Sequence, residues 1–148
     1  MNRMEMEKPI TILLVEDNPG DIRLVQEIFQ EGMISHQLEI VRDGEEAMLF
    51  LRQQDPYASA RLPDLILLDL NLPKKSGNQV LAEIKADSRL RKIPVIVLTA
   101  SKAEEDITRA YNNYGNCYLI KPIDLDEFIR VVQAIKMFWL SIVQLPED

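Results

Sequence analysis

Hydrophobic and polar residues alternate along the chain in short blocks. Five apolar runs, most of them rich in β-branched residues, cover residues 10–15, 38–41, 64–68, 94–98 and 117–120. Runs of this length between turn-forming residues are typical of strands that are buried on both faces. A helix signal follows each run, for example Ile22, Val25 and Phe29 at helical spacing. The pattern therefore predicts a strand followed by a helix, repeated five times.

Residues that favour helix starts stand before several of these expected helices. Such residues accept hydrogen bonds from the free N–H groups of the first helical turn. The loop over residues 55–63 carries two prolines and separates the second helix from the third strand. The candidate caps are Asn18 with Pro19 behind it, Asp43, Ser101 with Glu104, and Asp124 with Glu127.

The alternation of strands and helices indicates the fold class. Parallel strands joined by helical crossovers form a sheet with helices on both faces, and the crossovers are right-handed. We therefore expect an α/β fold with a doubly wound, five-stranded parallel sheet in the flavodoxin-like order 2-1-3-4-5. The expected organisation is a flexible arm over residues 1–8, one domain over 9–135, and an extension of the last helix with a tail over 136–148.

Composition narrows the possible functions. The 148 residues suit one domain, and a 47% hydrophobic content can supply its core. With 17 basic and 24 acidic side chains the net charge is −7, which argues against binding to nucleic acid. The single cysteine, Cys117, forms no internal disulfide. His36 is the single histidine, so residues for a zinc site or a catalytic triad are lacking, and we expect it to be a surface residue. No apolar run approaches the roughly 20 residues of a membrane span, so we expect a cytoplasmic protein.

The residues after each predicted strand are the candidates for chemistry, because ligands of open α/β sheets bind at the carboxyl ends of strands. The sheet brings these ends together, and the site would hold three carboxylates, two hydroxyls and one ammonium. The candidates are Glu16 and Asp17 after the first strand, Asp69 after the third, Thr99 and Ser101 after the fourth, and Lys121 after the fifth.

Carboxylates held this close repel one another, and a divalent cation removes that conflict. Oxygen ligands with open water positions suit Mg²⁺. The metal and Lys121 could hold a phosphoryl group, and Thr99 could donate a hydrogen bond to one of its oxygens. Asp69 could then attack phosphorus and form an aspartyl phosphate.

Four segments carry a family resemblance that covers residues 9–135. With ILLVEDNPGD, LILLDLNLPKKSG, IPVIVLTAS and NCYLIKP, the chain resembles the receiver domains of two-component response regulators. The resemblance implies that Asp69 is the phosphoacceptor and that Mg²⁺ is the cofactor. It implies that Asp17 binds the metal directly, Glu16 through water, and Asn71 through its backbone carbonyl.

The resemblance also implies a switch. Thr99 and Lys121 would contact the phosphoryl group, and Tyr118 would move inward when the Thr99 hydroxyl shifts toward phosphate. The peptide bond between Lys121 and Pro122 is usually cis in this family, a geometry that is accessible before proline. Ser76 replaces the usual aspartate before Gly77, and serine is also a competent helix cap.

A finer resemblance concerns the partners. The segments NLPKKSG, TASKAEEDI, NCYLIKPIDLDEF and FWLSIVQLP are similar to the single-domain regulators of phytochrome-type sensor histidine kinases. We expect a stand-alone receiver that signals by protein contact or phosphorelay and is not an enzyme beyond its own phosphorylation and dephosphorylation.

The last helix places Leu125, Phe128, Val132, Ile135, Trp139 and Ile142 at helical spacing. Val131, Phe138 and Val143 add apolar surface on other sides, which predicts a homodimer through the fourth helix, fifth strand and fifth helix.

Two alternatives remain at this point. A phosphatase of the haloacid dehalogenase type also uses a strand-end aspartate, a hydroxyl and a lysine with Mg²⁺, but it requires a second aspartate where Asn71 stands. The second alternative is a binding module, either a flavin carrier or a receiver that never becomes phosphorylated. A flavin site would need a phosphate-binding loop after the first strand, where EDNPGD instead places acids.

Overall fold

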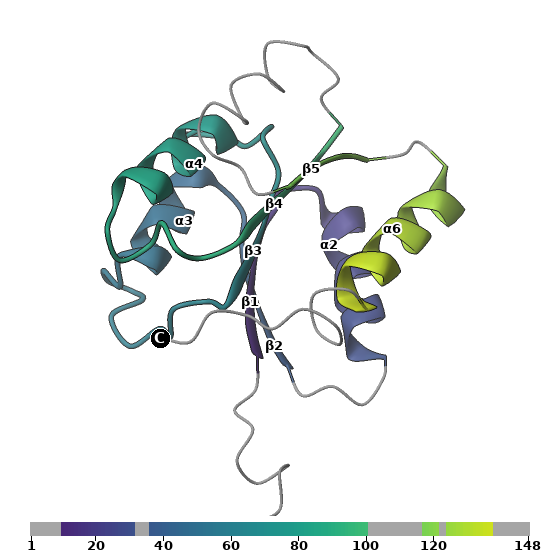
Figure 1. The fold of residues 1–148 in the computed structure, drawn as a ribbon, viewed down its shortest axis with the longest axis horizontal. Coiled ribbons are helices and arrows are strands. Elements are labelled where there is room, and N and C mark those ends of the chain that lie inside the picture. The colour runs from purple at the N-terminus through teal and green to yellow at the C-terminus, as the bar shows by residue number, and fades with distance from the viewer. Residues whose placement is uncertain (1–9, 32–35, 101–116, 122–123, 138–148) are drawn as a thin grey trace, which may run out of the picture.

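The computed structural model describes residues 10–31, 36–100, 117–121 and 124–137. Its centre is a five-stranded parallel sheet in the order β2-β1-β3-β4-β5, which confirms the predicted topology (Figure 1). The strands are short and each lies within two residues of its predicted bounds. They are β1 (Ile10–Val15), β2 (His36–Val41), β3 (Leu65–Leu68), β4 (Val95–Thr99) and β5 (Cys117–Ile120).

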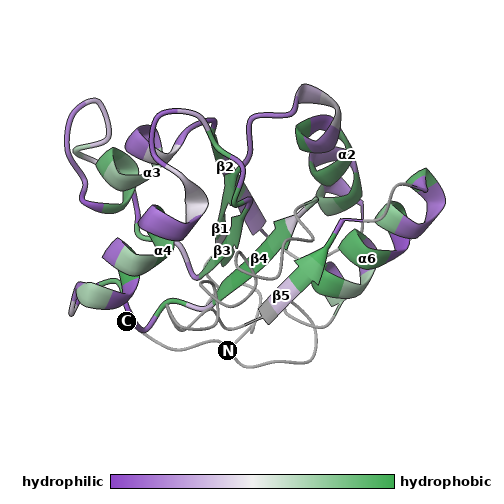
Figure 2. Cartoon of the chain, turned by 90° about the horizontal axis from the view of Figure 1, so that it is seen from above, coloured by the Kyte–Doolittle hydropathy of each residue, from purple (hydrophilic) through white to green (hydrophobic). Residues whose placement is uncertain are grey.

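Helices cover both faces of this sheet. Helices α2 (Pro19–Gln30) and α6 (Leu125–Met137) lie on one face, and α3 (Gly44–Leu51) and α4 (Gly77–Ala86) on the other. In Figure 2 their hydrophobic sides turn toward the strands. The helix predicted after Ser101, the arm over residues 1–8 and the tail from residue 138 lie outside the described residues. Among the helices in the described ranges, none is long and apolar enough to cross a bilayer.

The sheet separates two apolar clusters. Successive side chains of a strand point to opposite faces, so β1 contributes Leu13 to one cluster and Leu14 to the other. In the same way, β3 contributes Ile66 to the side of α3 and α4, and Leu67 to the side of α2 and α6. Burial on both faces explains why these strands are continuous apolar runs, and it fixes the register that sets where each strand ends.

Side-chain caps begin the helices where the sequence predicts them. The Asn18 Oδ1 accepts a hydrogen bond from the Asp21 N–H at 3.0 Å, and the Asp43 Oδ1 accepts one from the Glu46 N–H at 2.7 Å. Asp124 caps α6 through the Asp126 N–H at 2.8 Å. Ser76 forms a complete capping box with Gln79 at the start of α4, so the serine that departs from the family pattern serves as a cap.

Leu125 is 62% exposed, because it stands in the first turn of α6 before the helix packs on the sheet. One expectation needs correction. His36 is half-buried rather than a surface residue, since it begins β2 and its ring meets that of Phe29 edge to face at 5.9 Å.

Gly77 positions the start of α4 directly against the end of β3. A Cβ atom at this position would lie 2.3 Å from the Asp69 carbonyl oxygen and 2.5 Å from the Leu70 Cα. Only glycine permits this approach, because both neighbouring atoms belong to the backbone and have little room to move. The glycine thus holds the segment that carries Asp69 tightly against the body of the domain.

Candidate functional site

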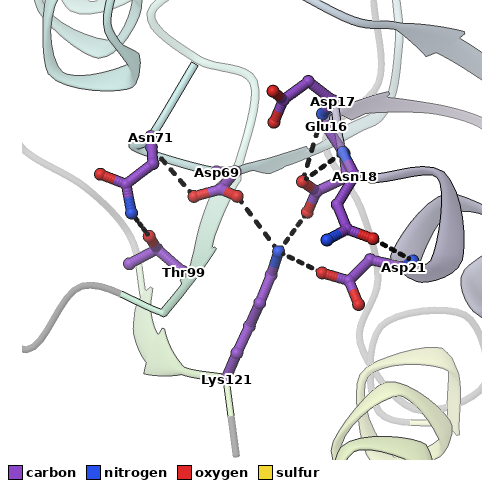
Figure 3. A network of polar contacts seen from close by, with 8 residues as sticks. All are labelled: Glu16, Asp17, Asn18, Asp21, Asp69, Asn71, Thr99 and Lys121. Atoms are coloured by element: carbon purple, nitrogen blue, oxygen red, sulfur yellow. Dashed lines mark hydrogen bonds and ion pairs between the residues drawn. The ribbon is translucent and has the colours of Figure 1, made fainter.

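The carboxyl ends of four strands meet at one edge of the sheet, as the sequence predicts (Figure 3). Glu16 and Asp17 follow β1, and Asp69 follows β3. Thr99 is the last residue of β4, and Lys121 follows β5. Ser101, the remaining candidate, lies outside the described residues.

Lys121 lies at the centre of the polar network. Its Nζ donates hydrogen bonds to the Glu16 Oε1, to the Asp21 Oδ2 at 2.7 Å and to the Asp69 Oδ2 at 3.1 Å. An ammonium group has three protons, so these three carboxylates occupy all of its donors. Burial lowers the pKa of Lys121, but the hydrogen bonds with Asp21 and Glu16 and the nearby negative charges outweigh burial and raise that pKa above its usual value. The lysine is therefore a fixed positive charge.

Asp21 is a site residue that the sequence reasoning missed. Acidic residues in the first turn of a helix are common because they interact favourably with the helix dipole. The sequence therefore gives no reason to assign Asp21 a second role, its contact with Lys121. The available signal was its place in the first turn of α2, whose N-terminus follows β1 and so lies at the same edge as Glu16.

Glu16 is almost fully buried, with 3% of its surface exposed. Its Oε2 accepts hydrogen bonds from the backbone N–H groups of Asp17 and Asn18, both at 3.2 Å. Burial and then the negative charge of Asp69 raise the pKa of Glu16 to about 7, against the opposing effect of Lys121. This carboxyl group therefore titrates near neutral pH, and a cation at the site would favour its ionised form.

Three carboxylates form a candidate cation site. Glu16, Asp17 and Asp69 each offer an oxygen, and these atoms lie within 4.8 Å of one another. Asp17 is exposed, whereas Glu16 and Asp69 are buried. An all-oxygen donor set with one side open to water fits a hard divalent cation such as Mg²⁺.

Asp69 and Thr99 are linked through Asn71. The Asp69 Oδ1 accepts a hydrogen bond from the Asn71 backbone N–H at 3.0 Å, while the Asn71 Nδ2 donates to the Thr99 Oγ1 at 3.3 Å. Asp69 is 6% exposed and Thr99 is fully buried. Tyr118 lies on β5, paired in register with Val97, and packs against the apolar cluster on the side of α3 and α4.

A strand-end aspartate beside an acidic cluster and a buried lysine, on a sheet of this order, defines the receiver class of signalling domains. The sequence matches the response regulator receiver domain over residues 12–133. The chain belongs to this family, and a histidine kinase is its partner class. This membership leaves the phosphatase and flavin-carrier alternatives without support.

Individual relatives cover nearly the whole chain. The response regulator Rcp1 of Synechocystis sp. is 51% identical over 142 residues, which span 96% of this chain and 97% of the relative. A probable methanogenesis regulatory protein, FilR2 of Methanothrix harundinacea, is 44% identical over 93% of this chain and 88% of its own length.

Solved structures agree closely with this fold. The Mn²⁺-bound form of Rcp1 has a TM-score of 0.92 and 52% identity, covering 94% of this chain and all of that one. The phosphorylated cyanobacterial phytochrome response regulator RcpA has a TM-score of 0.92 and 51% identity, covering 95% of this chain and all of that one. Divalent metal binding by the acidic cluster is consistent with the first of these structures.

The raised pKa of Glu16 predicts that Mg²⁺ affinity depends on pH. Below a pH of about 7 the carboxyl group holds a proton that the cation must displace, and above it the group is already ionised. Affinity should therefore rise as the pH increases from 6 to 8 and then level off. Isothermal titration calorimetry in two buffers of different ionisation enthalpy would show proton release at pH 6.5 that disappears by pH 8.5.

The matched variant for this titration is Glu16→Gln, which keeps the shape of the side chain and removes the ionisable group. We expect weaker binding with a much flatter pH profile. An unchanged profile in this variant would assign the titration to another group.

Proposed function

We propose that Asp69 accepts a phosphoryl group from a phosphohistidine of a sensor histidine kinase. The Asp69 carboxylate attacks phosphorus, the bond between phosphorus and the histidine nitrogen breaks, and the released imidazole takes up a proton from water. Water later attacks the aspartyl phosphate, which releases inorganic phosphate and restores the carboxylate. The observation that carries this proposal is the position of the Asp69 carboxylate, which shares an oxygen cluster with Glu16 and Asp17 and a hydrogen bond with Lys121.

The surrounding residues have distinct roles in this proposal. Asp17 and Asp69 would hold Mg²⁺ directly, Glu16 would hold it through water, and the backbone carbonyl of Asn71 would be a further ligand. When bound, the metal neutralises negative charge on the phosphoryl oxygens. Lys121 supplies a second positive charge to the same oxygens, which matters because phosphoryl transfer depends mainly on positioning and charge neutralisation.

The switch begins with the hydrogen bond between Asn71 and Thr99. In the unphosphorylated protein the Thr99 Oγ1 accepts a hydrogen bond from the neutral Asn71 Nδ2 at 3.3 Å. A phosphoryl group on Asp69 would accept a hydrogen bond from the Thr99 O–H, and such a charge-assisted bond is stronger than the neutral one. Thr99 moves toward the phosphoryl group and Tyr118 moves inward. The surface formed by the helix expected after Ser101, β5 and α6 changes as a result, so phosphorylation selects between two conformations.

The kinase that we propose as partner is of the phytochrome type. Support comes from the likeness to RcpA, which is described as a cyanobacterial phytochrome response regulator, and to Rcp1. We propose that the protein works in the cytoplasm, with output through protein contact or phosphorelay. Its own chemistry would be limited to phosphorylation from a donor and to self-dephosphorylation.

The direct test is intact-mass spectrometry after incubation with acetyl phosphate, with and without Mg²⁺. We expect one phosphoryl adduct that forms only with the metal. A protein that never forms the adduct would contradict the proposal. Steady release of phosphate without an adduct would point to phosphatase activity instead.

We also propose a homodimer through β5, α6 and the helix expected after Ser101. Among the described residues, three of the four most exposed large hydrophobic side chains lie on β5 or α6, at Ile120, Leu125 and Met137. Burial of such side chains favours association. Light scattering should give the mass of a dimer, and Leu125→Glu with Met137→Glu should shift it to a monomer. A monomeric mass for both the phosphorylated and the unphosphorylated protein would refute the dimer.

A further inference from the structure

We propose that Asp21 is a positioning residue for phosphoryl transfer, and that it acts on the reaction by holding the ammonium group of Lys121. This inference rests on the function proposed above and adds a residue to it. Nothing in the expected roles of the acidic pair, the phosphoacceptor or the switch residues involves Asp21.

The geometry of the contact is specific. The Asp21 Oδ2 lies 2.7 Å from the Lys121 Nζ, closer than the Asp69 Oδ2 at 3.1 Å. The Lys121 side chain is only 9% exposed and that of Asp21 is 27% exposed, so water screens this ion pair less than a surface pair. The Asp21 backbone is itself fixed, because its N–H group donates to the Asn18 cap. Figure 3 shows Asp21 approaching the ammonium group from the side of α2, apart from Glu16 and Asp69.

Asp21 differs from the other two partners of Lys121 in one respect. Glu16 and Asp69 belong to the cluster of oxygens that fits the cation, and among the described residues Asp21 does not. Cation binding competes for the Glu16 and Asp69 carboxylates, and phosphorylation converts the Asp69 carboxylate into an acyl phosphate. Of the three hydrogen bonds that the Lys121 ammonium group donates to Glu16, Asp21 and Asp69, the one to Asp21 is therefore the one that the reaction leaves intact.

A contact with Asp21 that lasts through the reaction would keep the ammonium group of Lys121 in one orientation. The side chain has a long, flexible stem, and its ammonium group rotates freely unless its protons are bound. With one proton fixed on Asp21, the other two stay directed toward Glu16 and Asp69, where a phosphoryl oxygen would arrive. Without Asp21 the ammonium group must be ordered during the reaction, which lowers the rate.

The test measures the rate of adduct formation with acetyl phosphate and Mg²⁺, which avoids any effect on kinase docking. Loss of a hydrogen bond between charged groups predicts a rate about tenfold lower for Asp21→Ala. Asp21→Asn keeps an acceptor oxygen and should recover part of this rate. Glu27→Gln is the matched control, because it removes one negative charge from the exposed side of the same helix, where Glu27 pairs with Arg23 at 3.1 Å. This control should react like the wild type, and circular dichroism would verify that each variant is folded.

A double-mutant cycle separates action through Lys121 from every other effect of Asp21. In a Lys121→Met background, adding Asp21→Ala should slow the reaction no further. Equal slowing in both backgrounds would overturn the inference, and so would an Asp21→Ala protein that reacts at the wild-type rate. A wild-type protein that forms no adduct would instead overturn the proposed function, and the inference with it.

Discussion

Replacing Asp69 with asparagine is expected to abolish the phosphoryl adduct, with a rate of formation reduced by at least about 10³-fold. The amide has the shape of the carboxylate but is a poor nucleophile, and it removes one of the three charges that fit the cation. It can still accept the hydrogen bond from the Asn71 N–H, so the local backbone should be retained. Intact-mass spectrometry with acetyl phosphate and Mg²⁺ would measure the effect.

The matched control is the same substitution at the opposite end of the same strand. Asp64 precedes β3 and its Oδ2 accepts a hydrogen bond from the Thr11 N–H at 2.9 Å, a contact that asparagine can reproduce. Asp64→Asn should keep the full adduct. An adduct of the wild-type amount on the Asp69→Asn protein would show that another residue is the acceptor.

Replacing Lys121 with methionine should destabilise the metal-free protein by about 3–5 kcal/mol, the usual cost of leaving buried charges without their partner. Glu16 and Asp69 would face each other with no cation between them, and both are buried. The free energy of unfolding from urea titration would measure this loss. Because Mg²⁺ can supply the missing positive charge, adding it should restore more stability to the variant than to the wild type.

Lys74→Met is the control for the lysine substitution. The Lys74 side chain is 61% exposed and lies 3.6 Å from Asp43, so its loss should cost less than about 1 kcal/mol. If Lys121→Met were no less stable than Lys74→Met in the absence of metal, the buried network would contribute little to the fold. Equal effects of Mg²⁺ on all three proteins would show that the cation and Lys121 do not share the same carboxylates.

The strands, their order and the residues at their ends were predictable because a strand that is buried on both faces is a continuous apolar run in the sequence. Runs such as residues 10–15 admit few other interpretations, and parallel strands necessarily bring their carboxyl ends together. The placement of Glu16, Asp17, Asp69 and Lys121 at one edge followed from this rule alone. Their roles in metal binding and phosphoryl transfer remain predictions that the proposed variants would test.

The features that sequence reasoning missed depend on tertiary contacts. From its position Asp21 is an ordinary acidic residue in the first turn of a helix, and only the tertiary fold, which packs α2 beside α6, brings it to Lys121 after β5. The hydrogen bond from Asn71 to Thr99 joins residues 28 positions apart, across two neighbouring strands. Leu125 follows the apolar spacing of its helix, and that spacing alone does not show that Phe128 is the first buried residue of α6. The spacing of apolar residues shows which side of a helix is apolar, but it does not show at which residue the helix begins to pack against the sheet.

The long sequence separations within the Lys121 network have a consequence for the newly made protein. Lys121 joins Glu16 across 105 positions, Asp21 across 100 and Asp69 across 52. A chain still being synthesised has its acidic residues long before the lysine that balances their charge. Phosphoacceptor competence therefore arises late in translation, after β5 has left the ribosome, and a kinase has no complete target on an unfinished chain.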